Sequence, residues 1–282
     1  MRNLDQNSIT DSALERIAKC DHPRLKEITT ALIRHVHDFA REVNLTPDEW
    51  MAGIEFLTAV GHMTDDKRHE FILLSDTLGL SALVDLLANR DKSDAATESS
   101  LLGPFFREGA PELRAGESIV RAIEGEAIVL RGRVTSTEGK PVGEARLDVW
   151  QASSDGRYDL QFDNFKGGEM NLRARFRTDA DGRYEFRSVK PSSYPVPSDG
   201  PVGRMLNALG RHPFRPAHIH FIISASGFKP LVTALYLDGD RYIDSDAVFG
   251  SREALVVKYE RDKSAGVDSI RYDFVIEPDA TR

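Results

Sequence analysis

From about Gly116 onward the chain consists of short segments rich in β-branched and aromatic residues, and this pattern most constrains the fold. Turn signals such as Asp-Gly separate the segments. We expect strands over 127–134, 145–151, 184–189, 218–224, 231–237, 254–259 and 270–276. About seven short strands with this punctuation are typical of an antiparallel β-sandwich and not of a parallel sheet.

The first hundred residues have a helical periodicity, because apolar residues recur at steps of three and four. We expect a helix over 23–43, a second that begins at Thr46-Pro47, and a third that Asp65 or Asp66 caps and Gly79 interrupts. The supporting apolar positions are Leu25, Ile28, Ala31, Leu32, Val36, Phe39, Trp50, Ile54, Phe56, Leu57, Val60, Phe71, Leu74, Leu78, Leu83, Val84 and Leu86.

A polar, charged stretch over 89–100 joins the two patterns. We therefore predict a mainly β protein with an α-helical N-terminal region. The predicted boundaries are a helical domain over 1–105 and a β-sandwich domain over 106–282. A chain of 282 residues is long enough for one large or two ordinary domains.

Composition excludes several classes of function. The net charge of −8 is spread along the chain without a basic block, which argues against nucleic acid as a partner. No apolar run is long enough to insert into a membrane, and the N-terminal residues lack the apolar core of a signal peptide. Cys20 is the only cysteine, so an internal disulfide is impossible and a reducing cytoplasm is the expected location.

Two histidines follow Pro216 in the predicted strand over 218–224. Alternate side chains of a strand point to the same face, so we expect His218 and His220 to project together. Neutral imidazole is a ligand for Zn, Cu, Fe and Ni, and the pair could form half of a metal site. His35 and His37 have the same spacing on a helix, where residues two apart do not face each other, and we interpret them as structural or surface residues.

The remaining ligands are less clear from the residues alone. No cysteine is near, and neither a His-Glu-x-x-His motif nor a Gly-x-Ser-x-Gly elbow occurs. Tyr158 and Tyr194, both in turns, are candidates. Two other readings stay open: a divalent-metal hydrolase with an Asp or Glu as third ligand, and a non-enzymatic β-sandwich binding module with a helical dimerisation arm.

Four ordered motifs change this interpretation: Trp-Gln-Ala at 150–152, Gly-Arg-Tyr at 156–158, Tyr-Pro-Val-Pro at 194–197 and Arg-Pro-Ala-His-Ile-His at 215–220. Together with segments 97–99, 103–105 and 244–250 they resemble the intradiol ring-cleavage dioxygenases, over about 71–276. The resemblance implies one non-haem Fe(III) held by Tyr158, Tyr194, His218 and His220.

The resemblance also implies roles. The substrates are a small aromatic diol and O2, and the product is a ring-opened diacid. Tyr194 is the ligand expected to be displaced and to accept a proton from the diol, while Tyr158 stays bound. Binding of a phenolate to a cation lowers its pKa far below the free value of about 10. Arg215 is expected to stabilise the anionic ring as it reacts.

Segments 194–203 and 211–214 are similar to the hydroxyquinol-cleaving members of the family more than to the catechol-cleaving ones. This implies conversion of benzene-1,2,4-triol to maleylacetate, in its enol form 3-hydroxy-cis,cis-muconate, with cleavage of catechol or chlorocatechol to cis,cis-muconates as the alternative. Where the family commonly has Thr followed by Gln or His, this chain has Thr233-Ala234. The expected pocket wall comprises Asp85, Leu101, Leu102, Gly103, Pro104, Phe105, Val196, Pro197 and Val248.

The helical region matches, by the same resemblance, the linker that joins two subunits of this family. We therefore predict a homodimer, with a phospholipid as a further ligand of the apolar groove between the helices. The apolar stripes of the helices suit this arrangement, although they suit packing within one chain equally well.

Overall fold

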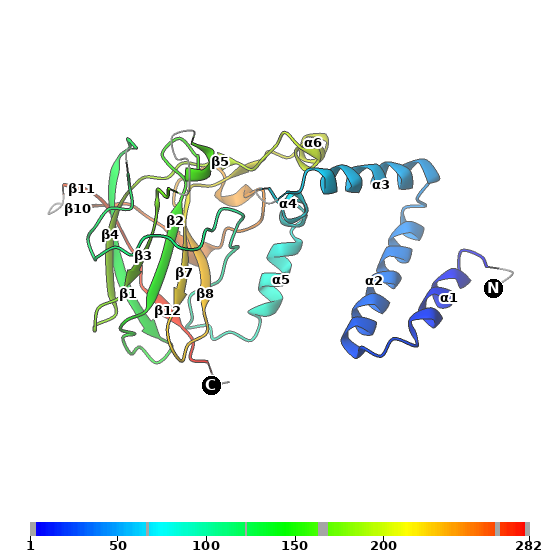
Figure 1. Cartoon of the computed structure of the whole chain (residues 1–282), viewed down its shortest axis with the longest axis horizontal. Coiled ribbons are helices and arrows are strands. Elements are labelled where there is room, and N and C mark those ends of the chain that lie inside the picture. The colour runs from blue at the N-terminus through cyan, green and yellow to red at the C-terminus, as the bar shows by residue number, and fades with distance from the viewer. Residues whose placement is uncertain (1–3, 66–67, 122, 163–168, 263–265, 280–282) are drawn as a thin grey trace. The chain divides into compact units, whose positions relative to one another are not determined.

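A computed structural model describes residues 4–65, 68–121, 123–162, 169–262 and 266–279 of the protein (Figure 1). The chain forms two compact units, Met1–Ala59 and Val60–Arg282. The predicted domain boundary at 105/106 stays a prediction. No single helix in the described ranges is long and apolar enough to cross a membrane; the helices Glu70–Thr77 and Leu80–Ala88, bent by 76°, pass that test only as a pair.

The first unit contains α1 (Ser8–Ile17), α2 (Pro23–Glu42) and most of α3 (Pro47–His62). The predicted N-terminus of α3 is confirmed: the Thr46 N–H donates to Glu49 Oε2 at 2.9 Å, and the Glu49 N–H donates to Thr46 Oγ1 at 3.3 Å. These reciprocal bonds form a capping box. His37 contacts Thr10 Oγ1 at 3.0 Å, which joins α2 to α1, a helix that the periodicity did not predict.

The apolar faces of the first unit lie on its surface. No residue of α1 or α2 is buried, although the apolar positions of α2 recur as predicted. The exposed apolar residues of α2 and α3 are Leu25, Ile28, Leu32, Val36, Phe39, Trp50, Met51, Ile54 and Leu57. Exposed apolar surface of this extent is unusual for a monomer and indicates an interaction surface.

The second unit begins with the end of α3, followed by α4 (Glu70–Thr77) and α5 (Leu80–Ala88). Gly79 separates these two helices with a left-handed φ of +78°, so the predicted interruption is confirmed. The predicted cap at Asp65 is wrong, because the N-cap of α4 is His69 and Asp65 accepts the Arg68 N–H at 2.8 Å in the preceding turn. Asp66 lies outside the described residues.

Two five-stranded sheets form the rest of the second unit. One has the order β10-β11-β1-β12 with β4 also paired to β1, the other has the order β3-β2-β7-β8-β9, and β5 pairs with β6. The strands are β1 (Ala127–Ser136), β2 (Arg146–Gln151), β3 (Arg173–Arg177), β4 (Arg183–Val189), β5 (Tyr194–Pro195), β6 (Phe214–Arg215), β7 (His218–Ser224), β8 (Leu231–Leu237), β9 (Val256–Val257), β10 (Glu260–Asp262), β11 (Val267–Arg271) and β12 (Phe274–Ile276). Short helical elements are α6 (Pro201–Ala208), η1 (Asp159–Gln161), η2 (Ile243–Ser245) and η3 (Glu253–Leu255).

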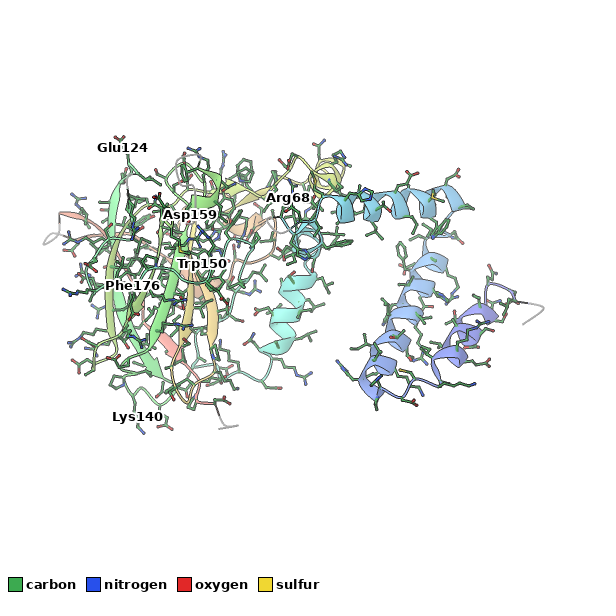
Figure 2. All side chains as sticks on the ribbon, in the orientation of Figure 1. Arg68, Glu124, Lys140, Trp150, Asp159 and Phe176 are labelled. Carbon is green, nitrogen blue, oxygen red and sulfur yellow. The ribbon has the colours of Figure 1, made fainter. Side chains whose placement is uncertain are left out.

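The main pairings, β1 with β4, β2 with β3 and β7, and β7 with β8, are antiparallel. Buried residues of both sheets form one core between them, and side chains fill this space (Figure 2). Phe176 of one sheet stacks on Phe186 of the other at 5.1 Å between ring centroids. Each such buried side chain contributes about 1.5–3 kcal/mol. The predicted β-sandwich with a helical N-terminal region is confirmed.

Three pairs depart from the antiparallel expectation: β11 and β12 run parallel to β1, and β9 runs parallel to β8. The predicted strand over 270–276 is therefore two strands in one continuous register along β1. The interruption arises at Tyr272. Its carbonyl oxygen lies 1.7 Å from the position that a Cβ on Gly132 would occupy. The Asp273 carboxylate then replaces a strand bond by accepting the Arg133 N–H at 2.9 Å.

Gly132→Ala tests this close approach. An added Cβ would overlap a backbone carbonyl, which cannot rotate away as a side chain can, so we expect the free energy of unfolding to fall by about 2–3 kcal/mol. Chemical denaturation measures the change. Gly53→Ala is the control, because nothing lies within 4 Å of its Cβ position in α3, and it is expected to cause no loss. Equal stability of the two variants would contradict the interpretation.

Candidate metal centre

Strand β7 places its two histidines on one face, as the alternation predicts. Their Nε2 atoms lie 3.0 Å apart, and each side chain is about 1% exposed. Ile219 and Phe221 point to the opposite face and belong to the core between the sheets. The Pro216 carbonyl lies 2.7 Å from His218 Nδ1. The Nδ1–H therefore donates to it, which leaves the Nε2 lone pair of His218 directed at its neighbour.

Both candidate tyrosines lie beside this pair. Tyr158 precedes η1, where its N–H donates to Gln161 Oε1 at 2.8 Å, and Tyr194 opens β5 and pairs with Arg215 of β6. The Tyr158 hydroxyl donates to the Tyr194 hydroxyl at 3.3 Å. The Tyr194 ring lies 5.5 Å from the His218 ring, so the tyrosine pair and the histidine pair form one buried cluster.

Neighbouring rings fix the orientation of the cluster. Trp150 stacks on His220 at 4.7 Å with an interplanar angle of 4°, and Phe105 stacks on Tyr158 at 4.2 Å with an angle of 17°. A Cβ at Gly103 would lie 3.5 Å from the His220 ring, so the chain passes close to the imidazole. These contacts hold the rings before any ligand is present, which lowers the cost of binding.

Burial sets the charge of each group. It lowers the pKa values of His218 and His220 well below the ordinary value, and Arg215 lowers them further, so both imidazoles are neutral and able to coordinate a metal. Burial and the adjacent Tyr194 raise the pKa of Tyr158 well above its ordinary value. A bound cation reverses this effect, because it favours the phenolate form.

Two imidazole nitrogens and two phenol oxygens suit a hard cation such as Fe(III), since phenolates are hard anionic donors. Among the described residues no group of three or more His, Cys, Asp or Glu side chains could hold a metal. The oxygen donors that lie beside His218 and His220 are the hydroxyls of Tyr158 and Tyr194. The donor set fits the ion that the sequence resemblance implies.

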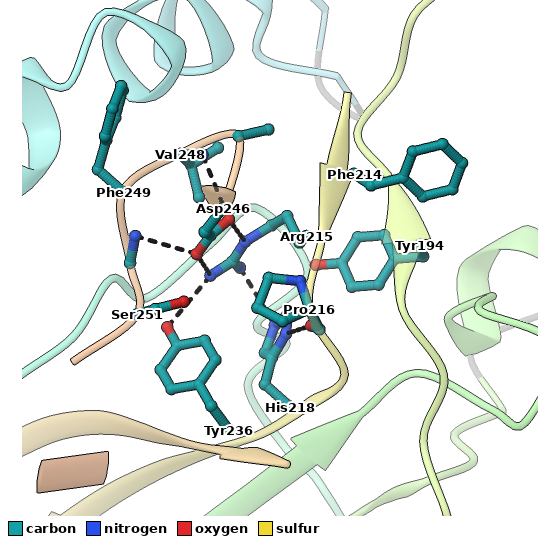
Figure 3. Close-up of polar contacts among 12 residues, drawn as sticks. Tyr194, Phe214, Arg215, Pro216, His218, Tyr236, Asp246, Val248, Phe249 and Ser251 are labelled. Carbon is teal, nitrogen blue, oxygen red and sulfur yellow. Dashed lines mark hydrogen bonds and ion pairs between the residues drawn. The ribbon is translucent and has the colours of Figure 1, made fainter. Parts of the chain in front are cut away.

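The Arg215 side chain lies 3% exposed at the edge of the cluster (Figure 3). Burial alone would lower its pKa, but Asp246, Tyr194 and Tyr236 outweigh burial and raise the pKa above the ordinary value. The guanidinium is therefore a fixed positive charge. Its Nη1 lies 3.1 Å from His218 Nε2, which brings this charge to the candidate metal ligands.

A cavity of about 130 Å³ lies against Tyr194 and Arg215. A protein cavity of roughly 150 Å³ holds benzene, so the size suits one aromatic ring. Seven of the residues predicted for the pocket wall line this cavity: Leu101, Gly103, Pro104, Phe105, Val196, Pro197 and Val248.

Leu102 and Asp85 are not among the residues that line the cavity. In the segment around Leu102 the neighbours alternate: Leu101 is buried and lines the cavity, whereas Leu102 is 41% exposed. Asp85 lies on α5, where its carboxylate accepts the Ser99 hydroxyl at 2.8 Å. In the helical region it is α4, the helix before α5, that lines the cavity.

Sequence reasoning missed that helical wall. The unpredicted lining residues are Arg68, His69, Glu70, Ile72, Leu73, Asp76 and Gln161. Asp76 carried a signal, because it is the single carboxylate within the apolar stretch 71–80. It is 8% exposed, and burial raises its pKa while a hydrogen bond from Ser81 lowers it. A buried carboxylate in a cavity wall marks a position for a polar group of a ligand.

Ala234, where the family commonly has a polar residue, lies directly opposite His220 in the pairing of β7 with β8. Its side chain is fully buried. The missing polar group would thus have been a neighbour of a candidate metal ligand. The other cross-strand partner on this side is Tyr236, opposite His218.

Comparison with known proteins shows the family of the chain. Residues 102–278 match the family model described as Dioxygenase, and residues 22–96 match the model described as Catechol dioxygenase N terminus. The chain is 46% identical to the 6-chlorohydroxyquinol 1,2-dioxygenase of Cupriavidus pinatubonensis, with 99% of each chain covered. It is 47% identical to the hydroxyquinol 1,2-dioxygenase of Rhizobium sp., over 90% of this chain and 86% of the relative.

A solved structure is similar over the same length. The crystal structure of hydroxyquinol 1,2-dioxygenase from Pseudomonas putida DLL-E4 superposes with a TM-score of 0.91 at 45% identity, covering 97% of this chain and 99% of that one. Matches of this extent cover the helical region and the sandwich together. The chain therefore belongs to the intradiol ring-cleavage dioxygenase family.

Proposed function

We propose that this enzyme binds one non-haem Fe(III) through Tyr158, Tyr194, His218 and His220 and cleaves hydroxyquinol, benzene-1,2,4-triol, with O2. The expected product is maleylacetate, in its enol form 3-hydroxy-cis,cis-muconate. The observation that carries the proposal is the buried cluster of two tyrosine hydroxyls and two neutral imidazoles beside a cavity of aromatic size. The hydroxyquinol and chlorohydroxyquinol activities named for the relatives support the choice of substrate.

When bound, the ferric ion would supply a Lewis acid for the diol and would draw electron density from the ring. The protein residues do the rest. Tyr194, on the short strand β5 at the cavity wall, would be held as a tyrosinate by the metal, and this phenolate oxygen would accept a proton from the entering diol. Tyr158 lies further from solvent, at 0% exposure, and is the tyrosine that stays in place. Arg215 provides a fixed positive charge for the anionic ring.

Asp76 is the group that we assign to the third hydroxyl of hydroxyquinol. Apolar residues such as Leu73, Leu101 and Val248 form much of the wall. Besides Asp76, Tyr194 and Arg215, its polar residues are Arg68, His69, Glu70 and Gln161. A carboxyl group within this wall can accept or donate a hydrogen bond. Catechol lacks that hydroxyl and would leave Asp76 without its ligand partner, which disfavours the smaller diol.

We also propose that the protein is a homodimer and that the exposed apolar face of α2 and α3 forms the contact. The support is the nine exposed apolar residues of these helices, which a second copy would cover. A phospholipid in this groove and a cytoplasmic location stay predictions from the sequence.

The iron proposal predicts a coloured protein, because tyrosinate-to-Fe(III) charge transfer absorbs visible light. We expect Tyr158→Phe to lose most of this band and to reduce diol cleavage by at least about 100-fold, since a ligand that tunes the metal is gone. Absorbance, iron content and O2 uptake measure the change. Tyr184→Phe is the control: this tyrosine is 3% exposed but lies on β4, in the sheet that holds no proposed ligand, where it donates to the Tyr272 carbonyl. An iron-loaded, colourless wild-type protein would refute the ligand set.

The substrate proposal predicts that Asp76→Leu changes the choice of diol. We expect kcat/KM for hydroxyquinol to fall relative to that for catechol by about 10–100-fold, because a hydrogen bond to the third hydroxyl is lost. Asp85→Leu is the matched control, since this carboxylate lies on α5 and does not line the cavity. If Asp85→Leu changes the ratio of the two kcat/KM values and Asp76→Leu does not, the third hydroxyl contacts Asp85, the residue predicted from the sequence.

The dimer proposal predicts a mass twice the 31.5 kDa of one chain in gel filtration with light scattering. We expect Leu32→Glu combined with Phe39→Glu to give a monomer, because two buried charges in an apolar interface are costly. Leu209→Glu is the control, since Leu209 is as exposed as Leu32 but lies after α6 in the second unit. A wild-type monomer would exclude this contact.

A further inference from the structure

We propose that Asp246 is a positioning residue that orients Arg215 towards the reacting ring. The inference rests on the proposed function, since it assigns Arg215 to the anionic ring of a bound diol. Asp246 follows η2 and is 5% exposed. Asp246 lies in segment 244–250, which the sequence resemblance includes, but its side chain does not line the aromatic cavity.

The contact between the two residues has two points (Figure 3). Arg215 Nε donates to Asp246 Oδ1 at 3.2 Å, and Arg215 Nη2 donates to Asp246 Oδ2 at 3.3 Å. Two parallel bonds between a guanidinium and a carboxylate fix the plane as well as the place of the guanidinium. Both side chains are buried, at 3% and 2% exposure, so solvent does not compete for this pair.

The carboxylate is itself held by the backbone. Asp246 Oδ1 accepts the Val248 N–H at 3.3 Å, and Oδ2 accepts the Gly250 N–H at 3.0 Å. The neighbouring Ala247 N–H donates to the Phe214 carbonyl at 3.1 Å, next to Arg215 in β6. The Asp246 carboxylate therefore cannot rotate without losing its hydrogen bonds to the loop backbone. Its fixed position in turn fixes the position of the Arg215 guanidinium.

The Tyr236 hydroxyl contacts the Arg215 guanidinium on the same side as Asp246. Arg215 Nη2 lies 3.3 Å from the Tyr236 hydroxyl, which is also 2.8 Å from Ser100 Oγ, and Ser100 Oγ donates to the Gly250 carbonyl at 2.9 Å. Burial raises the pKa of Tyr236 to about 12, so the hydroxyl is neutral and can accept the bond.

These bonds leave one edge of the guanidinium for chemistry. Arginine has five N–H donors. Asp246 and Tyr236 engage the Nε and Nη2 side, whereas Nη1 points to His218 Nε2 at 3.1 Å. The Nη1 edge thus faces the candidate metal ligands, and Arg215 also lines the aromatic cavity. Without Asp246, a single bond from Nη2 to the Tyr236 hydroxyl would remain on the opposite side, and one bond does not fix the plane of the guanidinium.

Asp246→Asn tests the inference, because an amide keeps the volume but can accept on one side only. We expect kcat for hydroxyquinol to fall by about 100-fold, as a misplaced charge near the reacting atoms does. Iron content and the visible band without diol should be unchanged, because no proposed ligand is altered. In an Arg215→Gln background the same substitution should cost less than about threefold, since its partner is already absent.

The matched control is Asp148→Asn. Asp148 is also buried, at 3% side-chain exposure, and accepts Arg175 Nε at 2.7 Å, but it lies on β2 and does not line the cavity. It should lower the melting temperature without changing kcat or KM. A loss of kcat for Asp246→Asn that is equally large with and without Arg215 would overturn the inference, and so would full activity of that variant.

Gly250→Ala covers the case in which Asp246→Asn does not fold. A Cβ there would lie 2.7 Å from Arg215 Nη2 and 3.0 Å from Asp246 Oδ2, so it displaces the guanidinium while every charge remains. We expect at least a tenfold loss of kcat, and unchanged kcat would contradict the proposal. Failure of the wild-type enzyme to cleave any diol would instead reject the proposed function, so the two failures are distinguishable.

Discussion

The need to bury both faces of β7 determines the rest of the structure. Ile219 and Phe221 fill the core at 0% exposure, while the alternate His218 and His220 lie in the site at 1%. A shift of one residue would exchange the two sets, so the register must be strictly held. The neighbouring strands hold it with the rings that also orient the imidazoles: Trp150 of β2 pairs with His220, and Tyr236 of β8 pairs with His218.

The local sequence pattern was sufficient to predict some strands and helices. It predicted β7 and β8 with their observed bounds, and the main helices α2 and α3 closely. It failed for β3, because the arginines of this strand hide the pattern and Arg173 is buried only through its ion pair with Asp159. It also merged β11 with β12, since the break depends on a close approach to a glycine far away in sequence.

Some residues of the candidate site were likewise predicted from the sequence and others were not. Its four proposed ligands and Arg215 were named from sequence motifs, which place Tyr194, Arg215 and the two histidines on β5, β6 and β7 and Tyr158 just before η1. The wall that α4 provides was not predicted, because periodicity shows that a helix has an apolar face but not which turn meets a cavity. Asp85 and Asp76 both lie in apolar helical segments, and only the packing of α4 beside the sandwich distinguishes them.

Helix α4 and the strands contribute different parts of the candidate site, which has a consequence for how the substrate preference of this enzyme can evolve. Asp76 and Leu73 contact the cavity from an element that holds none of the proposed donor atoms, so the preference for ring substituents can drift by changes in one helix. The loop at 246–250 has no such freedom. Val248 forms part of the wall, yet its backbone shares a carboxylate with Arg215, so adaptation at that side of the ring also perturbs reactivity.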